Sequence, residues 1–329
     1  MRAAAFRGEL LEPLGRLRWG EACARAADEE GLEPAGDEVD EAVAAFRYDR
    51  DLISAEETEA WLEARGLGAD DLAAHFARES WLRQLKGRVP VPIAGSAPGG
   101  AEELPALAAA LLLSDGFPPL ARALVQRLAV PPAAGKGDAA AVAQEREHFL
   151  GRTGLVPGGV GAWLQAWGRG EEWLQEMLAA EAAYRAHCAA EVTSEKLARA
   201  LVSARLGLTR LEVEQVEFDS LDAVREAELC VREDGLSLEE IAGESQYPFE
   251  RKQHYAEDLP EAQRDSLLFA QVGTLLHVAS EGGEFQLRRV VHRFEPQLEE
   301  PEVRRRLEHR ILEQGFSEAV GSDLRWIIS

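Results

Sequence analysis

The chain has 329 residues, of which 46% are hydrophobic and 29% are charged, which is typical of a soluble protein with about two or three domains. Its 59 Asp and Glu against 36 Lys and Arg give a net charge of −23. This charge excludes a phosphate-backbone binding surface as the main function and disfavours anionic membranes. We therefore expect no nucleic acid and no membrane as partner, and the charge favours basic or apolar peptides.

The amino-terminal stretch becomes acidic too soon for a secretory signal, and the apolar run at 104–113 is too short to span a membrane. A cytoplasmic location is expected from these two features. The cysteines, Cys23, Cys188 and Cys230, form no CxxC pair, so neither a zinc site nor a disulfide framework is supported. No histidine pair has metal-ligand spacing, and no nucleotide-binding motif is present. We expect neither a cofactor nor a metal.

The first two thirds of the chain carries almost no strand pattern. Apolar residues at helical spacing predict helices over 9–30, 37–48, 54–65, 70–86, 103–113, 118–128, 171–187 and 194–206. The helix at 54 opens with a capping-box pattern, Ser54 to Glu57. Stretches rich in Pro and Gly, at 88–100 and 131–137, are expected to be linkers.

Residues of one kind recur 102 positions apart in this helical part. The matched pairs are Trp61 and Trp163, Leu62 and Leu164, Leu72 and Leu174, Phe76 and Leu178, and Glu79 and Glu181. Such regular spacing predicts a duplicated helical module, although two copies do not make a solenoid. The tryptophans either pack in the core or line a peptide groove, since aromatic residues are also favoured at binding surfaces.

A change of pattern marks the last third. Alternating residues predict a strand over 211–218, and helices are expected over 219–227, 236–242 and 258–269. Two further strands, 274–279 and 285–293, flank a glycine turn at 280–283. This order predicts a small α+β unit. A helix over 300–316 with an arginine cluster at 304–306 follows, and the apolar tail at 324–328 is expected to dock on another surface.

That order resembles the parvulin (PpiC-type) peptidyl-prolyl isomerase domain. The resemblance lies in "VEQVEF", "GLSLEEIA", "DLPEAQRDSLLFA" and "GGEFQLRRVVHR", and the first helical module is similar to the body of SurA-like chaperones. Together they imply an α+β fold that is mostly α: a duplicated SurA-like body, a degenerate parvulin-like domain and a carboxy-terminal helix. The implied divisions are helical module 1 (1–87), linkers with two short helices (88–137), helical module 2 (138–208), the parvulin-like domain (209–296) and a helix with tail (297–329).

The departures from the parvulin pattern bear on activity. Gln215 and Gln286 stand where parvulins carry histidines, and residues 247–255 replace the loop that supplies a Cys or Asp. A glutamine does not titrate near neutral pH, so the paired change suggests a structural hydrogen bond without the original chemistry. The resemblance implies a groove whose floor, walls and rim are drawn from Gln215, Gln286, Phe218, Leu259, Leu268, Phe269, Tyr247 and Tyr255. The alternative for Phe218, Leu268 and Phe269 is ordinary core packing.

A chain of this kind resembles PpiC-related proteins of peptide maturation systems, which accompany ribosomally synthesised, modified peptides. The function implied is non-catalytic: the protein binds a precursor peptide and presents it to a modifying enzyme. The alternative is an active parvulin-type peptidyl-prolyl cis–trans isomerase with chaperone activity, because isomerisation needs no covalent step, only a lower barrier than roughly 20 kcal/mol. A third hypothesis is a scaffold subunit whose tail docks on an enzyme.

Overall fold

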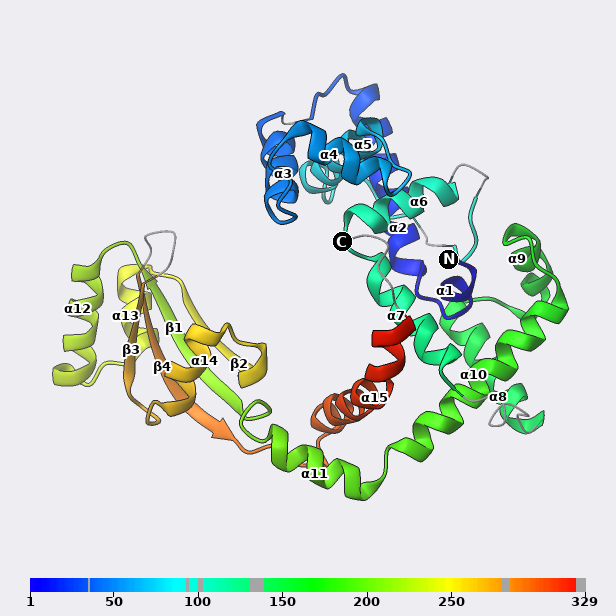
Figure 1. The fold of residues 1–329 in the computed structure, drawn as a ribbon. Coiled ribbons are helices and arrows are strands. Elements are labelled where there is room, and N and C mark those ends of the chain that lie inside the picture. The colour runs from blue at the N-terminus through cyan, green and yellow to red at the C-terminus, as the bar shows by residue number, and fades with distance from the viewer. Residues whose placement is uncertain (35, 93–94, 100–102, 131–138, 280–284, 324–329) are drawn as a thin grey trace. The chain divides into compact units, whose positions relative to one another are not determined.

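The computed structural model describes residues 1–34, 36–92, 95–99, 103–130, 139–279 and 285–323 (Figure 1). The expected linker at 131–137, the turn at 280–283 and the tail at 324–328 lie outside these residues. The chain divides into a helical unit, Met1–Ala190 with Phe316–Ser329, and a sheet unit, Glu191–Gly315. Helices dominate and a single four-stranded antiparallel sheet accompanies them, so the predicted α+β, mostly α class is confirmed.

The helical unit contains only helices and loops among its described residues, as its sequence predicts. Its helices are α1 (Arg2–Phe6), α2 (Leu11–Glu29), α3 (Gly36–Tyr48), α4 (Ala55–Glu63), α5 (Ala69–Gln84), α6 (Glu103–Leu113), α7 (Phe117–Leu128), α8 (Ala139–Thr153), α9 (Val160–Ala166) and α10 (Glu171–Glu191). The sequence prediction lacks α1, α8 and α9. Two of these are shorter than eight residues, and such helices depend on tertiary packing more than on their own pattern.

The predicted duplication is present as two helix–turn–helix pairs, α4–α5 and α9–α10. Each pair turns at a glycine with left-handed backbone, Gly66 at φ 68° and Gly168 at φ 61°. In each copy the next amide donates back into the first helix, from Leu67 to Leu62 and from Arg169 to Leu164, at 2.9 Å in both cases. Only glycine adopts this conformation at little cost, so the repeated glycines explain why both turns have the same shape.

The equivalence extends to side chains that the two pairs bury. In the first copy Phe46 of α3 meets Trp61 edge-on with ring centroids 5.3 Å apart, and in the second Phe149 of α8 meets Trp163 at 5.2 Å. The repeated glutamates also behave alike, because Glu79 pairs with Arg16 of α2 and Glu181 pairs with Arg127 of α7 at 2.8 Å. Each copy is therefore a three-helix module, α3–α5 or α8–α10.

The main core of the helical unit lies on the second copy. Phe6 of α1 stacks on Phe149, and Trp163 and Trp167 are each only 2% exposed. Core packing, the first of the two readings for the tryptophans, is confirmed for these two and for Trp81. Within the described residues no single helix is both long and apolar enough to cross a membrane; α6 and α7 reach that length and composition together, with a bend of 98° between them.

The sheet unit places its helices on both faces of a sheet of strand order β2-β1-β4-β3. Its elements are α11 (Ser194–Ala204), β1 (Arg210–Phe218), α12 (Leu221–Leu229), the π-turn Cys230–Asp234, α13 (Leu238–Ser245), β2 (Phe249–Tyr255), the 3-10 turn Ala256–Asp258, α14 (Glu261–Phe269), β3 (Leu275–Ala279), β4 (Phe285–Phe294) and α15 (Pro301–Asp323), of which residues from Phe316 belong to the helical unit.

Strand β2 corrects the prediction that residues 247–255 form a loop. All seven of its residues pair with β1, from Tyr255 opposite Arg210 to Phe249 opposite Val216. The segment is polar because β2 is an edge strand, where charged side chains face water and discourage pairing with other chains. The alternation that identifies a half-buried strand is therefore missing from its sequence.

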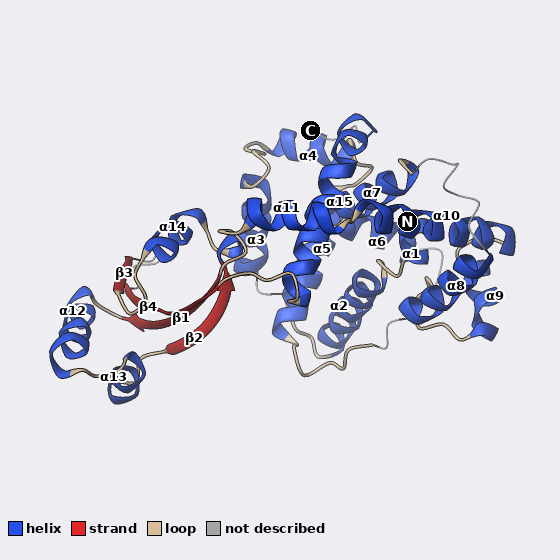
Figure 2. Ribbon diagram, turned by 90° about the horizontal axis from the view of Figure 1, so that it is seen from below, coloured by secondary structure: helices blue, strands red, loops and turns tan. Residues whose placement is uncertain are grey.

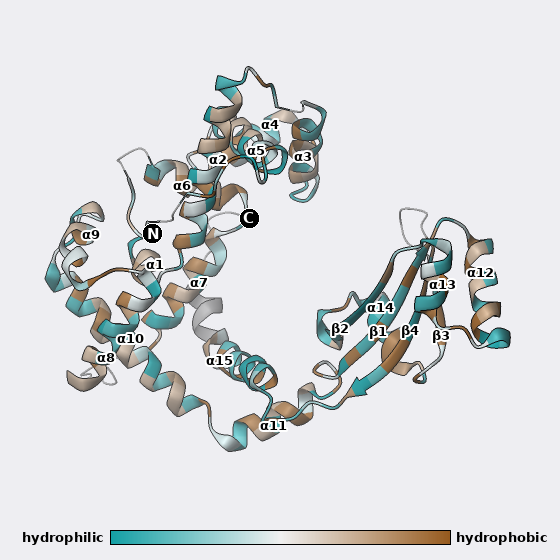
Figure 3. Cartoon of the chain, turned by 180° about the vertical axis from the view of Figure 1, so that it is seen from behind, coloured by the Kyte–Doolittle hydropathy of each residue, from teal (hydrophilic) through white to brown (hydrophobic). Residues whose placement is uncertain are grey.

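The two faces of the sheet are covered differently. On one face α12 and α13 bury Val216, Phe218 and Leu287, and on the other α14 covers Leu211, Val213 and Val290 (Figure 2). Polar and apolar residues mix along β1, since its side chains point alternately to the two faces (Figure 3). We call these the α12/α13 face and the α14 face.

Helix α15 closes the sheet unit on the side of α11. Val303 and Leu307 pack with Leu197 and Leu208 in one buried cluster. Because α11 belongs to this cluster, it is part of the sheet unit, which begins at Glu191. The arginine cluster pairs with acidic neighbours, and Arg306 donates to Asp258 at 2.7 Å.

Candidate functional site

A row of polar side chains crosses the α14 face of the sheet. Arg288 of β4 donates to Gln263 of α14 at 2.8 Å and to the Gln286 amide oxygen at 2.6 Å. The Gln286 amide nitrogen then donates to Glu217 Oε1 at 3.0 Å, and the Gln215 amide nitrogen donates to the same oxygen at 3.2 Å. Five side chains from two strands and one helix thus form one hydrogen-bonded network that includes the Glu217 carboxylate.

Strand register brings these residues together. Glu217 lies opposite Gln286 and Gln215 lies opposite Arg288 in the antiparallel pairing of β1 with β4. Residues two apart share a face, so all four side chains point to the α14 side. The next pair on the same face is apolar, with Val213 opposite Val290, and the register shift lies beyond it, between Glu212 and Val213.

The network joins a buried guanidinium to a carboxylate through an amide. Burial lowers the pKa of Arg288, while the nearby Glu217 carboxylate acts in the opposite direction, and a guanidinium stays protonated in proteins. The amides do not titrate. Among the described residues, Arg288 Nε is buried without a hydrogen-bond partner. The arrangement can hold a hydrogen-bonded ligand through its amides and its carboxylate.

The two glutamines predicted as the groove floor are brought together, because both donate to Glu217. The expected structural bond between them runs through Glu217 and not from one amide to the other. Glu217, Gln263 and Arg288 were missed by the sequence reasoning. Glu217 and Arg288 each lie two residues from a predicted glutamine, and this period-two spacing is the signal that identifies them.

Three of the other predicted site residues lie away from the glutamines. Phe218 is 3% exposed and lies with Tyr247 on the α12/α13 face, with ring centroids 4.8 Å apart. Tyr255 packs toward α15, where the Arg306 guanidinium lies 4.2 Å from its ring centroid. For Phe218 the alternative of core packing is correct. These three side chains do not lie on the α14 face and so do not form a wall or a rim around the two glutamines.

Three predicted residues do lie on the α14 side. Leu259 and Leu268 pack in the apolar cluster between α14 and the sheet. Phe269, at the end of α14, is 76% exposed and therefore accessible to a ligand. The titratable His277 of β3 lies elsewhere, because its Nε2 is 2.8 Å from Glu228 of α12 on the opposite face.

Comparisons with known proteins add little beyond the fold. No protein-family model and no curated protein matches the chain. Solved structures similar to it include the peptidylprolyl isomerase PrsA from Bacillus cereus, with a TM-score of 0.39 and 15% identity over 65% of this chain and 86% of that one. The foldase protein PrsA from Streptococcus pneumoniae gives a TM-score of 0.28 and 11% identity over 64% and 86%. Likeness at this level says nothing about activity.

Proposed function

We propose that this chain is a non-catalytic peptide-binding protein that holds a ribosomally synthesised precursor peptide and presents it to a modifying enzyme. The observation that carries the proposal is the network around Glu217. It places a carboxylate, three amides and a guanidinium on the α14 face, with no histidine among its members. Amides and carboxylates bind peptide backbone, and the amide groups do not titrate.

Two oxygen atoms of the network can accept hydrogen bonds from a peptide. Only Glu217 Oε1 receives the two glutamine amides, and within the described residues neither Glu217 Oε2 nor the Gln215 oxygen has a hydrogen-bond partner. Backbone N–H groups of an extended peptide are matching donors. Exposed Phe269 supplies an apolar contact on the same unit. The net charge of −23 favours a basic peptide.

The test is mass spectrometry of peptides that co-purify with the tagged full chain from its native host. One short precursor peptide, retained by the wild type and lost from the Glu217→Gln variant, is the expected result. Glu214→Gln is the matched control, because Glu214 lies on the same strand but faces the other side and pairs with Arg289 at 2.6 Å. Recovery of many unrelated unfolded proteins would overturn a dedicated role.

The isomerase alternative is tested separately with a proline-containing peptide. We expect cis–trans exchange of an X-Pro peptide to stay at the uncatalysed tens to hundreds of seconds in the presence of the protein. Exchange accelerated by the wild type and slowed by Glu217→Gln would instead establish an active isomerase on the same face.

A further inference from the structure

The second copy of the helical repeat binds a segment of this chain's own backbone. Trp163 and Trp167 both donate their indole N–H to the carbonyl oxygen of Ser96, at 3.0 and 3.3 Å. Ser96 is part of a stretch without helix or strand, and Arg18 donates to its neighbours, to the Gly95 oxygen at 3.1 Å and the Ala97 oxygen at 2.6 Å. This face of the repeat therefore takes an irregular peptide segment through tryptophan and arginine donors.

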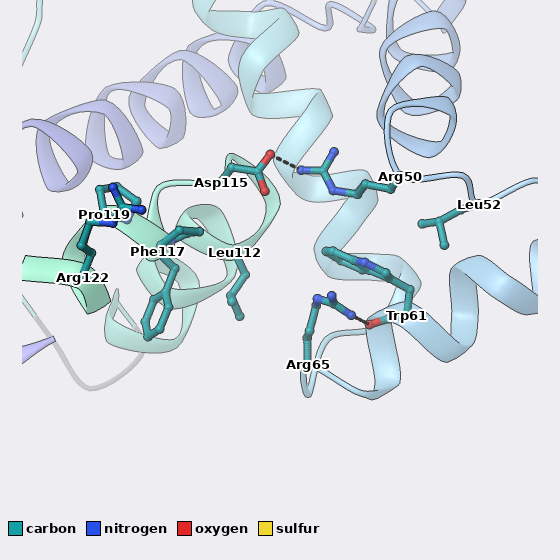
Figure 4. A pocket seen from close by; sticks show the side chains of 10 residues that line it. Arg50, Leu52, Trp61, Arg65, Leu112, Asp115, Phe117, Pro119 and Arg122 are labelled. Atoms are coloured by element: carbon teal, nitrogen blue, oxygen red, sulfur yellow. Dashed lines mark hydrogen bonds and ion pairs between the residues drawn. The ribbon is translucent and has the colours of Figure 1, made fainter. Parts of the chain in front are cut away.

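The same face of the first copy borders a cavity instead. Leu52, Trp61 and Arg65 correspond to Leu155, Trp163 and Trp167, and they line a space of about 840 Å³. Its other wall comes from α6 and α7, where Leu112 and Phe117 lie across the space from Trp61 (Figure 4). Trp61 is only partly buried, and within the described part of the chain its indole nitrogen has no acceptor. The donor that holds Ser96 in the second copy is thus available in the first.

The charged side chains that line the cavity are mostly basic. Arg50, Arg65 and Arg122 line it, with Asp115 as the one acidic lining residue, although the whole chain carries a net charge of −23. Arg50 pairs with Asp115. The Arg65 guanidinium lies 3.6 Å from the Trp61 ring centroid and donates to the Trp61 backbone oxygen at 2.9 Å. A planar guanidinium held against an aromatic ring is well placed to receive a carboxylate.

We propose that this cavity binds an extended segment of a partner protein that carries acidic residues beside small or apolar ones. A backbone carbonyl of the partner takes the position that Ser96 has in the second copy and accepts from Trp61 Nε1. A carboxylate of the partner pairs with Arg65, and an apolar side chain fills the space toward Leu112 and Phe117. The proposal does not rest on the function proposed for the sheet unit, because all of these residues belong to the helical unit.

The experiment is selection of random dodecapeptides displayed on phage against the immobilised full chain. Affinities of the selected peptides are then measured by fluorescence polarisation. We expect sequences enriched in Asp and Glu next to apolar residues, with binding weakened about tenfold or more by Arg65→Glu. Trp61→Phe keeps the ring but removes the N–H donor, so a smaller loss is expected. Binding by Arg25→Glu, an exposed arginine of the same unit outside the cavity, is expected to equal that of the wild type.

A direct readout accompanies the affinities. In ¹⁵N-labelled protein the indole N–H resonance of Trp61, assigned through Trp61→Phe, is expected to shift on peptide binding while that of Trp163 stays in place. Peptides unaffected by Arg65→Glu but lost from Glu217→Gln bind the sheet unit, and a selection that returns only these overturns the proposal. So does a selection dominated by basic peptides, or binding that leaves the Trp61 resonance unchanged.

Discussion

Trp61 and Trp163 occupy equivalent positions in two copies of one helical repeat, yet within the described residues only Trp163 donates its indole N–H to a backbone carbonyl. Both rings meet a phenylalanine of the preceding helix edge-on. The difference arises outside the repeats: α1 and the stretch around Ser96 cover the second copy, whereas a cavity borders the first. One local structure thus serves as core in one place and as accessible surface in the other.

This asymmetry predicts unequal effects of removing the two rings. Trp163→Ala is expected to lower the free energy of unfolding of the helical unit by about 3–5 kcal/mol, because it leaves a cavity in a packed core. Trp61→Ala is expected to lower it by only about 1–2 kcal/mol, since part of the ring already faces water. Urea unfolding followed by the fluorescence of the remaining tryptophans measures both. Equal losses would contradict the difference in burial.

Local pattern was enough to predict the repeat but not its environment. Helices α4, α5 and α10 follow from apolar spacing, and the duplication follows from residues that recur 102 positions apart, whereas α9 was not predicted. The burial of Trp163 depends on Ser96, a residue 67 positions away, and no periodicity indicates such a contact. The same holds for the sheet unit, where the alternation of β1 identifies a strand, while the polar edge strand β2 carries no such signal.

The candidate site was predictable in part for a similar reason. Gln215 and Gln286 were found through the parvulin resemblance, and the α14 face does bring them to one carboxylate. Glu217 is one of 59 acidic residues in the chain, and alternation alone does not tell which face of a strand a helix covers. Phe218 was assigned to the groove although its neighbours in sequence place it on the opposite face.

A buried carboxylate in α8 offers a second stability test. The Glu145 side chain is 1% exposed, and Arg152 and Arg185 lie 2.5 and 2.6 Å from its oxygens. Glu145→Ala leaves these guanidinium groups without their buried counter-charge, so we expect a loss of about 3–5 kcal/mol in the free energy of unfolding. Glu171→Ala is the control, because its ion pair with Arg146 is largely exposed and is worth at most about 1 kcal/mol. Similar losses for both variants would argue against the burial of Glu145.

His75 of α5 predicts an acid sensitivity of the helical unit. Burial lowers the pKa of this 7% exposed side chain to about 4 from its ordinary 6.5, with Glu79 opposing and Arg78 and Arg16 reinforcing the shift. The unfolded chain therefore binds a proton that the folded chain does not, and stability present above pH 6.5 is lost as the pH falls toward 4. The loss amounts to about 3 kcal/mol at its largest.

The measurement for His75 is the free energy of unfolding as a function of pH, for the wild type and for His75→Phe. Phenylalanine keeps a ring against Phe76, whose centroid lies 5.1 Å from that of His75, but has no group to titrate. The variant is expected to lose stability less steeply than the wild type between pH 6.5 and 4. Parallel curves would show that His75 titrates normally in the folded protein.

The polar network of the sheet unit leads to a coupling between Glu217 and Arg288. Arg288 is 9% exposed, and its charge is balanced through Gln286 by the Glu217 carboxylate. Glu217→Gln removes that charge and leaves the guanidinium buried, so a loss of about 1–3 kcal/mol in the free energy of unfolding is expected. Arg288→Met in the same chain removes the buried cation, and part of the loss is expected to be recovered, since apolar replacement of buried ionic groups is often tolerated.

Hydrogen exchange followed by mass spectrometry measures this coupling, because residues 191–315 contain no tryptophan and fluorescence reports on the helical unit. Amides of β1 and β4 are expected to exchange faster in Glu217→Gln and more slowly again in the double variant. Glu250→Gln, an exposed change on β2, is the control with wild-type exchange. Additive effects of the two substitutions would show that Glu217 and Arg288 act independently, and the network would then be a set of separate contacts.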